Sequence, residues 1–316
     1  MVGFYNCENL FDTLDNAYTQ DQEYLPTSKK HWNTKKYNEK LAHIARVILA
    51  MSDWEGPDIV GLCEVENKQV VEDLIHKTYL NQHDYRIIHK ESRDIRGIDV
   101  AMIYKASAFE LIRYEYIRLF EDKDTRPTRD ILYAKGFLKQ ADTVHLFFNH
   151  WPSRFEGVAE TKNKRAFAAT ILRQQVDRIF EDNPQALILI AGDFNDDVDN
   201  TSMTQNLGAH TELNDSLTPP YLFNTSYALK KEKKWGSHKH QGRWSIFDQW
   251  IVSSGVLDNS HKLTLNPRNS IIFQREWMMQ EDNQSFGLKP FRSYEGDAYI
   301  GGYSDHLPVC IKLDVK

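Results

Sequence analysis

The segment 186–197 constrains the fold of this chain most strongly, because an apolar run ends there abruptly in polar residues. Residues 186–191 are all apolar, with helix-breaking residues on both sides, which is typical of a strand buried on both faces. Gly192, Asp193, Phe194 and Asn195 follow. Asp193 and Asn195 are two residues apart, so their side chains point the same way at the end of a strand. A simple turn is one interpretation; a rigid edge that presents oxygen ligands to a cation or a phosphate is the other.

Length and composition indicate one large folding unit. The chain has 316 residues, of which 41% are hydrophobic and 12% aromatic, enough for a substantial core. No linker interrupts the sequence, so we expect a single domain over residues 1–316. No apolar run approaches the roughly 18 residues of a membrane span. The net charge of −6 does not point to nucleic acid, although a local basic surface would suffice to bind it.

Hydrophobic periodicity predicts strands and helices in mixed order. We expect helices over 37–51 and 161–180 and a shorter one around 70–78. We expect strands over 2–6, 59–63, 85–89, 100–104, 109–117, 131–138, 143–148, 186–191, 246–252 and 309–315. Because strands alternate with helices in some places and follow one another directly in others, the chain should form mixed sheets with helices packed outside. The segments 13–38, 199–239 and 262–295 lack a clear pattern, and we expect the first to be a long surface loop.

Polar residues stand at or just beyond the ends of several predicted strands. They are Asn6, Glu64, His150, Asp193, Asn195, Asp305 and His306. Each alone has a simpler explanation: Asn6 could cap a turn, Glu64 could cap a helix, and Asp305 with His306 could form a turn before Pro308. In α/β sheets, however, ligands bind at the carboxyl ends of strands. One shared site explains all seven residues together.

The order of these residues resembles the endonuclease/exonuclease/phosphatase superfamily, which includes pancreatic-type DNases, abasic-site endonucleases, inositol-polyphosphate phosphatases and neutral sphingomyelinases. The matching motifs are Asn6, Glu64, Asn149-His150, Gly192-Asp193-Phe194-Asn195, Asp248 and Ser304-Asp305-His306. The resemblance runs from the first strand to the last. It implies an α/β fold of four layers, in which two mixed β-sheets pack face to face with helices outside. The mixed order of predicted elements agrees with that fold.

The resemblance also implies a role for each residue of the motifs. Glu64 resembles the metal-binding glutamate, and Asn6 the neighbouring asparagine that supports metal and phosphate. Asp305 resembles an acid that contacts the metal or the nearby histidine. Asp193 and Asn195 resemble the pair that orients the water and holds the phosphate. His306 resembles the catalytic histidine, and Asp248 its carboxylate partner. His150 resembles a second histidine, and Asp99 the carboxylate that orients it.

The residue types suit hydrolysis of a phosphoester. Carboxylate and amide oxygens at Glu64, Asn6 and Asp305 favour Mg²⁺, with Mn²⁺ or Ca²⁺ as alternatives, and such a cation neutralises phosphate charge as a Lewis acid. His306 could act as a general base if Asp248 fixes its tautomer and raises its pKa. Asp193 is a rival candidate for the base, and the sequence does not decide between the two.

Further signals come from isolated basic and aromatic residues. Arg154, Arg126 and Arg129 could clamp a phosphate, or could be surface arginines with solvated heads. Residues 230–244 mix Lys, His, Arg and Trp, which could grip single-stranded nucleic acid or could simply be solvated. Trp151 and Tyr303 could stack on a substrate or pack at its rim.

These observations predict a Mg²⁺-dependent phosphoesterase, with a phosphodiesterase or nuclease-like activity preferred. A phosphomonoesterase or a lipid phosphodiesterase for inositol phosphates or sphingomyelin is the alternative, because substrate choice depends on loops. A binding module without catalysis on the same scaffold is a third. We expect a monomer. The sequence begins directly in a strand-like run without a leader peptide, so we expect it to be trimmed, and the compartment, export included, stays open.

Overall fold

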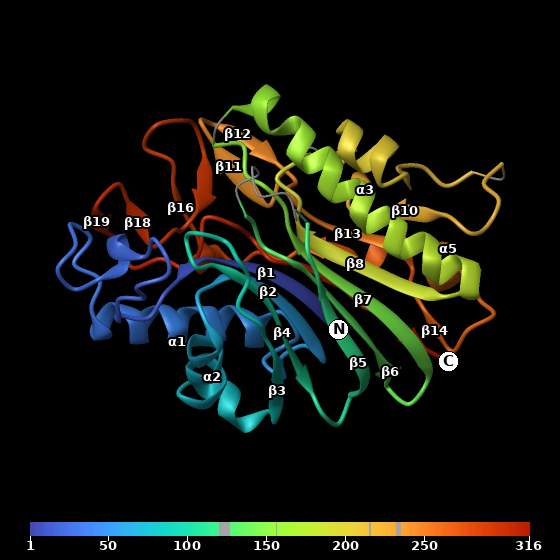
Figure 1. Ribbon diagram of the computed structural model, residues 1–316, viewed down its shortest axis with the longest axis horizontal. Coiled ribbons are helices and arrows are strands. Elements are labelled where there is room, and N and C mark those ends of the chain that lie inside the picture. Colours follow the sequence, from blue (N-terminus) through green and yellow to red (C-terminus); the bar gives the residue numbers. More distant parts are fainter. Residues whose placement is uncertain (120–126, 156, 215, 232–234) are drawn as a thin grey trace.

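Two large mixed β-sheets form the centre of the molecule (Figure 1). The computed structural model describes residues 1–119, 127–155, 157–214, 216–231 and 235–316. The first sheet contains, in spatial order, β15 (Ser270–Ile272), β20 (Val309–Ile311), β1 (Val2–Leu10), β2 (Ile59–Val65), β4 (Asp99–Lys105) and β3 (Tyr85–Ile88). The second contains β5 (Phe109–Ile117), β6 (Ile131–Leu138), β7 (Asp142–His150), β8 (Leu187–Asp193), β13 (Asp248–Ser253), β10 (Leu222–Asn224) and β9 (Ala209–His210). Each sheet has a parallel pair at its centre, β1 with β2 and β7 with β8.

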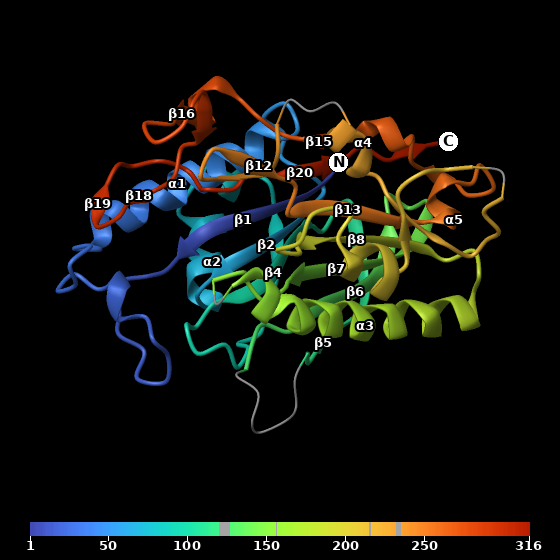
Figure 2. The same cartoon turned by 90° about the horizontal axis from the view of Figure 1, so that it is seen from above.

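The sheets pack face to face, and helices cover their outer faces (Figure 2). Helices α1 (Thr34–Ala50) and α2 (Lys68–His76) lie on the first sheet, and α3 (Val158–Asp182) lies on the second. Three hydrophobic clusters separate these four layers. The predicted four-layer α/β sandwich is therefore confirmed. None of the described helices is long and apolar enough to cross a membrane.

The packing of strand β8 explains why the central strands have unbroken apolar sequences. Leu187, Leu189 and Ala191 face the cluster between the two sheets, whereas Ile188 and Ile190 face the cluster under α3. Side chains alternate along a strand, so a strand that is covered on both faces needs apolar residues at every position. The two sheets also approach each other closely at Gly61 of β2, because an added Cβ there would lie 2.1 Å from a ring carbon of Phe148.

Smaller elements complete the fold. The shorter helices are α4 (Tyr227–Lys231) and α5 (Ser254–Leu257). Single turns of 3-10 or π-helix span Gln22–Tyr24, Tyr79–Gln82, Ser202–Asn206, Pro267–Asn269 and Glu276–Met278. Four two-stranded ribbons pair β11 (His238–His240) with β12 (Arg243–Ser245), β14 (Leu263–Thr264) with β21 (Asp314–Val315), β16 (Met279–Glu281) with β17 (Leu288–Pro290), and β18 (Tyr294–Glu295) with β19 (Ala298–Tyr299).

Several predicted boundaries need correction. Helix α1 begins at Thr34 rather than at residue 37, because the side chain of Asn33 caps it by accepting from the backbone N–H groups of Lys35 and Lys36. Strand β13 begins at Asp248 rather than at residue 246. The predicted last strand, 309–315, is two short strands, β20 and β21, in different sheets.

Candidate active site

Three strands of the second sheet bring a histidine and two acids side by side. Asp193, the last residue of β8, pairs with His150 at the end of β7 and with Asp248 at the start of the antiparallel β13. His150 and both carboxylates are at most 2% exposed. Asp193 Oδ2 lies 3.7 Å from His150 Nε2. The N–H of Asn195, two residues on, donates to Asp193 Oδ1 at 2.9 Å and fixes the carboxylate.

The first sheet adds an amide and a glutamate from a paired irregularity of β1 and β2. The register shifts after Asn6 in β1, and again around Glu64 in β2, where φ is +58°. Bulges of this kind re-aim side chains next to active sites. Asn6 Nδ2 donates to Asp193 Oδ2 at 3.1 Å, and Glu64 Oε1 lies 3.7 Å from His150 Nε2. The N–H of Asn9 donates to the other oxygen of Glu64 at 2.9 Å.

The third part of the site is the segment 304–306 just before β20. Ser304 Oγ donates to the carbonyl oxygen of Asn6 at 2.8 Å and accepts from the N–H of His306 at 3.1 Å, which fixes the segment against β1. His306 Nδ1 lies 2.6 Å from Asp248 Oδ2, and its Nε2 lies 3.8 Å from Asp193 Oδ2. The structure thus brings together residues from both sheets that are up to 300 positions apart (Asn6 to His306).

One predicted pair is wrong. Asp99 does not orient His150; its Oδ2 lies 3.1 Å from His89 Nε2, and its Oδ1 accepts from the N–H of Ser92 at 2.7 Å. His89 stands at the end of β3, the strand next to β4, and no sequence motif marks it. His150 Nδ1 is buried and has no hydrogen-bond partner among the described residues.

Burial and charge shift the protonation of the site residues. Burial raises the pKa of Asp193 to about 7, against the opposing effect of the nearby His306. Burial alone would lower the pKa of His306, but the carboxylates of Asp248 and Asp193 outweigh it and hold this pKa well above its usual value. Burial, with the guanidinium of Arg129 nearby, lowers the pKa of His150 well below its usual value. The site therefore combines an imidazolium paired with Asp248, a neutral imidazole at His150 and a carboxylate that gains and loses a proton near neutral pH.

The predicted phosphate-clamp arginines have partners within the protein. Arg129 is 4% exposed and donates to Asp94 Oδ2 at 3.1 Å and to the carbonyl of Trp151 at 2.7 Å. Arg154 is a quarter exposed, and its guanidinium donates to the Asn195 carbonyl and to Asp196 Oδ1, at 2.7 and 2.9 Å. Arg126 lies outside the described residues.

The aromatic and basic candidates also have structural roles. Trp151 is fully buried against Phe194, and Tyr303 is buried beside His43 and Trp277. The described lysines of the segment 230–244 contact acids: Lys230 pairs with Asp199, Lys231 with Glu212 and Lys239 with Asp282. Lys233 and Lys234 lie outside the described residues.

Four residues around the site, Glu8, Lys40, His238 and Arg292, were given no catalytic or metal-binding role by the sequence analysis. Arg292, 42% exposed, donates from Nη2 to Asp305 Oδ2 at 3.3 Å and from Nε to Glu8 Oε1 at 3.2 Å. Lys40 of α1, 1% exposed, donates to the other oxygen of Glu8 at 3.2 Å. His238 of β11 lies next to His306, with 4.6 Å between the ring centroids. Two of them carried a sequence signal: Glu8 lies two residues from Asn6 along β1, and His238 lies in the basic and aromatic segment 230–244.

The donor set fits a hard divalent cation. Glu64 Oε1 points at the site while Oε2 is held by a backbone N–H; of the other two predicted ligands, Asn6 Oδ1 accepts from the N–H of Glu8 and Asp305 Oδ2 accepts from Arg292. Mg²⁺ typically takes one or two carboxylates from the protein and keeps several waters. Among the described residues, Glu64 is in no group of three His, Cys, Asp or Glu ligands within 4.8 Å, and Asp305 forms such a group with His238 and His306 instead.

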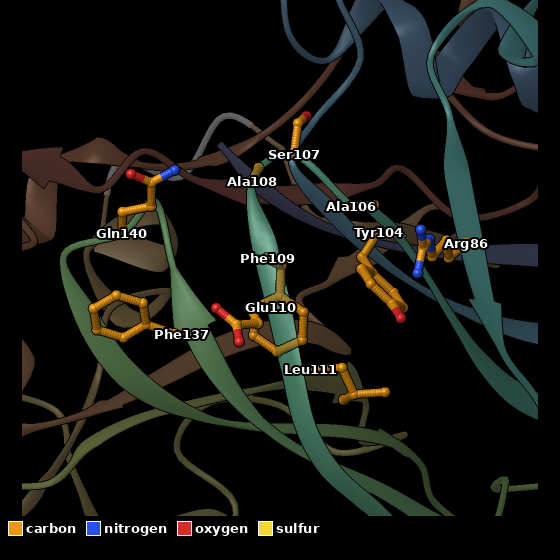
Figure 3. Close-up of a pocket in the computed structure, with 10 residues that line it drawn as sticks. All are labelled: Arg86, Tyr104, Ala106, Ser107, Ala108, Phe109, Glu110, Leu111, Phe137 and Gln140. Atoms are coloured by element: carbon orange, nitrogen blue, oxygen red, sulfur yellow. The ribbon is translucent and has the colours of Figure 1, made fainter.

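Figure 3 shows the residues that line a separate cavity of about 480 Å³. Tyr104, Phe109, Glu110 and Phe137 line it. Tyr104 pairs with the first residue of β2, whereas Glu64 stands near that strand's last residue. No residue of the candidate site lines this cavity.

The architecture is that of the DNase I-like sandwich. A humanized D. rerio TDP2 with 14 mutations superposes with a TM-score of 0.61 at 16% identity, covering 99% of this chain and 98% of that one. A D. rerio TDP2 complexed with single-strand DNA product gives 0.54 at 17% identity, over 87% and 93% of the chains. A mannosyl-6-phosphatase of Bacteroides thetaiotaomicron gives 0.55 at 15% identity, over 99% and 98%.

The sequence identifies the family. Residues 1–315 match the endonuclease/exonuclease/phosphatase family, and the chain belongs to it. No curated protein matches the sequence significantly. The chain is therefore a metal-dependent phosphoric ester hydrolase, as the motifs predicted.

Proposed function

We propose that this enzyme is a Mg²⁺-dependent phosphodiesterase of the nuclease-like type. The observation that carries the proposal is the position of the Asp193 carboxylate, whose Oδ2 has imidazole nitrogens of His150 and His306 at 3.7 and 3.8 Å and the amide of Asn6 at 3.1 Å. A water molecule bound beside this oxygen would be next to a base and to donors for a phosphoryl group.

Asp193 is the proposed base. A carboxylate with a pKa of about 7 can take a proton from water near neutral pH. His306, whose pKa is raised by Asp248, is protonated at that pH, so it serves as a cation that stabilises charge on the phosphoryl oxygens. The neutral imidazole of His150 can donate a hydrogen bond to the same group. Bound at Glu64 with Asn6 and Asp305, Mg²⁺ supplies Lewis-acid neutralisation of phosphate charge.

The charge around the site supports a diester over a monoester. The four carboxylates Glu64, Asp193, Asp248 and Asp305 face the site, and within the described chain its neighbouring guanidinium groups are held by acids or carbonyls. A monoester dianion would meet more repulsion there than a singly charged diester. The resemblance in fold to a TDP2 bound to single-strand DNA makes nucleic acid a natural first substrate to test. The fold of the mannosyl-6-phosphatase keeps the monoester as the alternative.

Hydrolysis of a matched substrate panel tests the proposal. The panel holds a chromogenic phosphodiester and its monoester, supercoiled plasmid, single-stranded DNA, RNA, inositol polyphosphates and sphingomyelin, each with Mg²⁺ and with EDTA. We expect metal-dependent diester cleavage that falls at least about 10²-fold in His306→Ala and in Asp193→Ala. His210→Ala, which removes an exposed histidine on β9, is the control. A near-wild-type rate in either site variant refutes the assignment, and cleavage of monoesters alone would favour the alternative.

A further inference from the structure

His238 lies beside the catalytic histidine in a fixed position. Ribbon β11–β12 is joined to the segment 304–307 by a β-bridge between His238 and His306 and by the Leu307 N–H, which donates to the carbonyl of Ser237 at 2.7 Å. Ser237 Oγ in turn accepts from the N–H of Asp248 at 3.0 Å. Backbone contacts therefore hold the His238 ring against the ring of His306. The reaction proposed above does not use His238.

Two imidazoles and a carboxylate meet at this point. One ligand atom each from His238, Asp305 and His306 lie within 4.8 Å of one another. Zinc held at about 2.1 Å by each ligand would bring them to about 3.4 Å apart. Small rotations of the three side chains, of which that of Asp305 is 25% exposed, can close that difference. Two nitrogens and one oxygen suit Zn²⁺ better than Mg²⁺, which prefers oxygen ligands alone.

Both histidines have a nitrogen available for a metal. His306 Nδ1 is bound to Asp248, so Nε2 is the nitrogen that a metal can bind once it displaces the Nε2 proton, and a carboxylate behind a histidine is the usual support of a metal-bound imidazole. His238 Nδ1 is buried without a hydrogen-bond partner among the described residues. A buried nitrogen of this kind normally finds a partner, and a metal bound at Nδ1 would supply one.

We propose that His238, Asp305 and His306 form an inhibitory site for a transition-metal ion of the Zn²⁺ type. A Zn²⁺ ion at this site displaces the proton of His306 Nε2 to solvent and binds the lone pair that is left, so His306 can no longer present a proton to the substrate. It also takes Asp305 away from Mg²⁺. Binding stands on the geometry alone, whereas the inhibitory consequence rests on the function proposed above.

Zn²⁺ binding, measured by calorimetry without Mg²⁺ and without substrate, tests the site. We expect His238→Asn to weaken the binding at least about tenfold, since the loss of even a supporting contact at metal sites costs 10- to 100-fold in affinity. His240→Asn is the matched control, because His240 is an exposed histidine on the same strand, and it should bind Zn²⁺ like the wild type. Circular dichroism establishes that both variants are folded.

Zn²⁺ binding at a second histidine–carboxylate group must be distinguished from binding at the His238 site. His89, Glu91 and Asp99 also offer three ligand atoms within 4.8 Å. The titrations are therefore repeated in a His89→Gln background. Zn²⁺ binding that disappears with His89→Gln and is unaffected by His238→Asn would overturn the proposal.

Inhibition of Mg²⁺-dependent hydrolysis gives the second readout. The rate of each variant with Zn²⁺ is compared with the rate of the same variant without Zn²⁺, so a change in the basal rate does not affect the comparison. We expect Zn²⁺ to inhibit the wild type and His240→Asn, and we expect the inhibition to be weaker at higher Mg²⁺ concentration. The same degree of inhibition in His238→Asn should require a Zn²⁺ concentration at least about tenfold higher. Zn²⁺ binding that depends on His238 but does not change the rate of hydrolysis would refute the inhibitory role, and the assignment of the binding site would stand. An enzyme inactive on every substrate, with the same binding result, would instead count against the proposed function.

Discussion

Replacing Lys40 tests whether the buried ion network behind the site stabilises the fold. All three protons of the Lys40 ammonium have acceptors: Glu8 Oε2 at 3.2 Å, Ser293 Oγ at 2.6 Å and the carbonyl of Tyr303 at 2.7 Å. Lys40 and Glu8 are 1% and 5% exposed. Lys40→Met keeps much of the side-chain volume but leaves a buried carboxylate without this cation.

The expected cost follows from these contacts. Breaking a buried ion pair by removing one partner typically costs 3–5 kcal/mol. The lower end, about 3 kcal/mol, applies here because Glu8 keeps the guanidinium of Arg292 and the N–H of Ser293. A chain of 316 residues has an unfolding entropy of roughly 0.66 kcal/mol/K near its midpoint. The midpoint should therefore fall by about 4 to 5 °C.

Urea and thermal unfolding measure this difference, with Lys35→Met as the control. Lys35 is an exposed lysine of the same helix, so its replacement should change stability by no more than about 0.5 kcal/mol. The double variant Lys40→Met with Glu8→Gln removes the unpaired charge and should recover part of the loss. If Lys40→Met is no more destabilising than Lys35→Met, the reasoning about the buried pair is wrong.

Three further changes test other parts of the structure. Asp248→Asn removes the carboxylate that raises the pKa of His306, so the imidazolium should deprotonate at lower pH and the alkaline limb of the pH–rate profile should move to lower pH; an unchanged limb would contradict this. Gly61→Ala places a Cβ against Phe148 and should cost about 1–3 kcal/mol in urea unfolding, partly restored by Phe148→Leu. Burial raises the pKa of Glu66 from 4.5 to about 8, so the wild type should lose on the order of 4 kcal/mol of stability as pH rises through that window. Glu66→Gln should lack this loss, and equal pH dependence in both proteins would speak against a buried, protonated Glu66.

Local patterns predicted most of the fold. The strands over 109–117 and 131–138 have the predicted bounds, because alternation and apolar runs reflect the faces that a strand buries. Strands β9 and β10, with two and three residues, were missed. Such short segments carry no periodicity, and pairing at the sheet edge, β10 with β13 and β9 with β10, is what makes them strands.

The site was predicted less evenly than the fold. Asn6, Glu64, His150, Asp193 and His306 come together because the topology places their strand ends at one end of the sandwich. Sequence alone could not show the partners of groups that meet only through tertiary packing. Asp99 was assigned to His150 but pairs with His89. The contacts of Arg292 and His238 with the segment 305–306 depend on the segments 262–295 and 199–239, whose sequences lack a clear pattern.

The division of the site between the sheets has a consequence for experiments on assembly. Asn6 and Glu64 belong to the first sheet and His306 stands just before a strand of it, whereas His150, Asp193 and Asp248 belong to the second. The chain first passes from one sheet to the other between Lys105 of β4 and Phe109 of β5. A cut there would separate two fragments, each with an incomplete set of these groups, and turnover would return only when the fragments reassociate in register. Hydrolysis can thus report on complementation between the fragment with β1 to β4 and the fragment with the second sheet, β15 and β20.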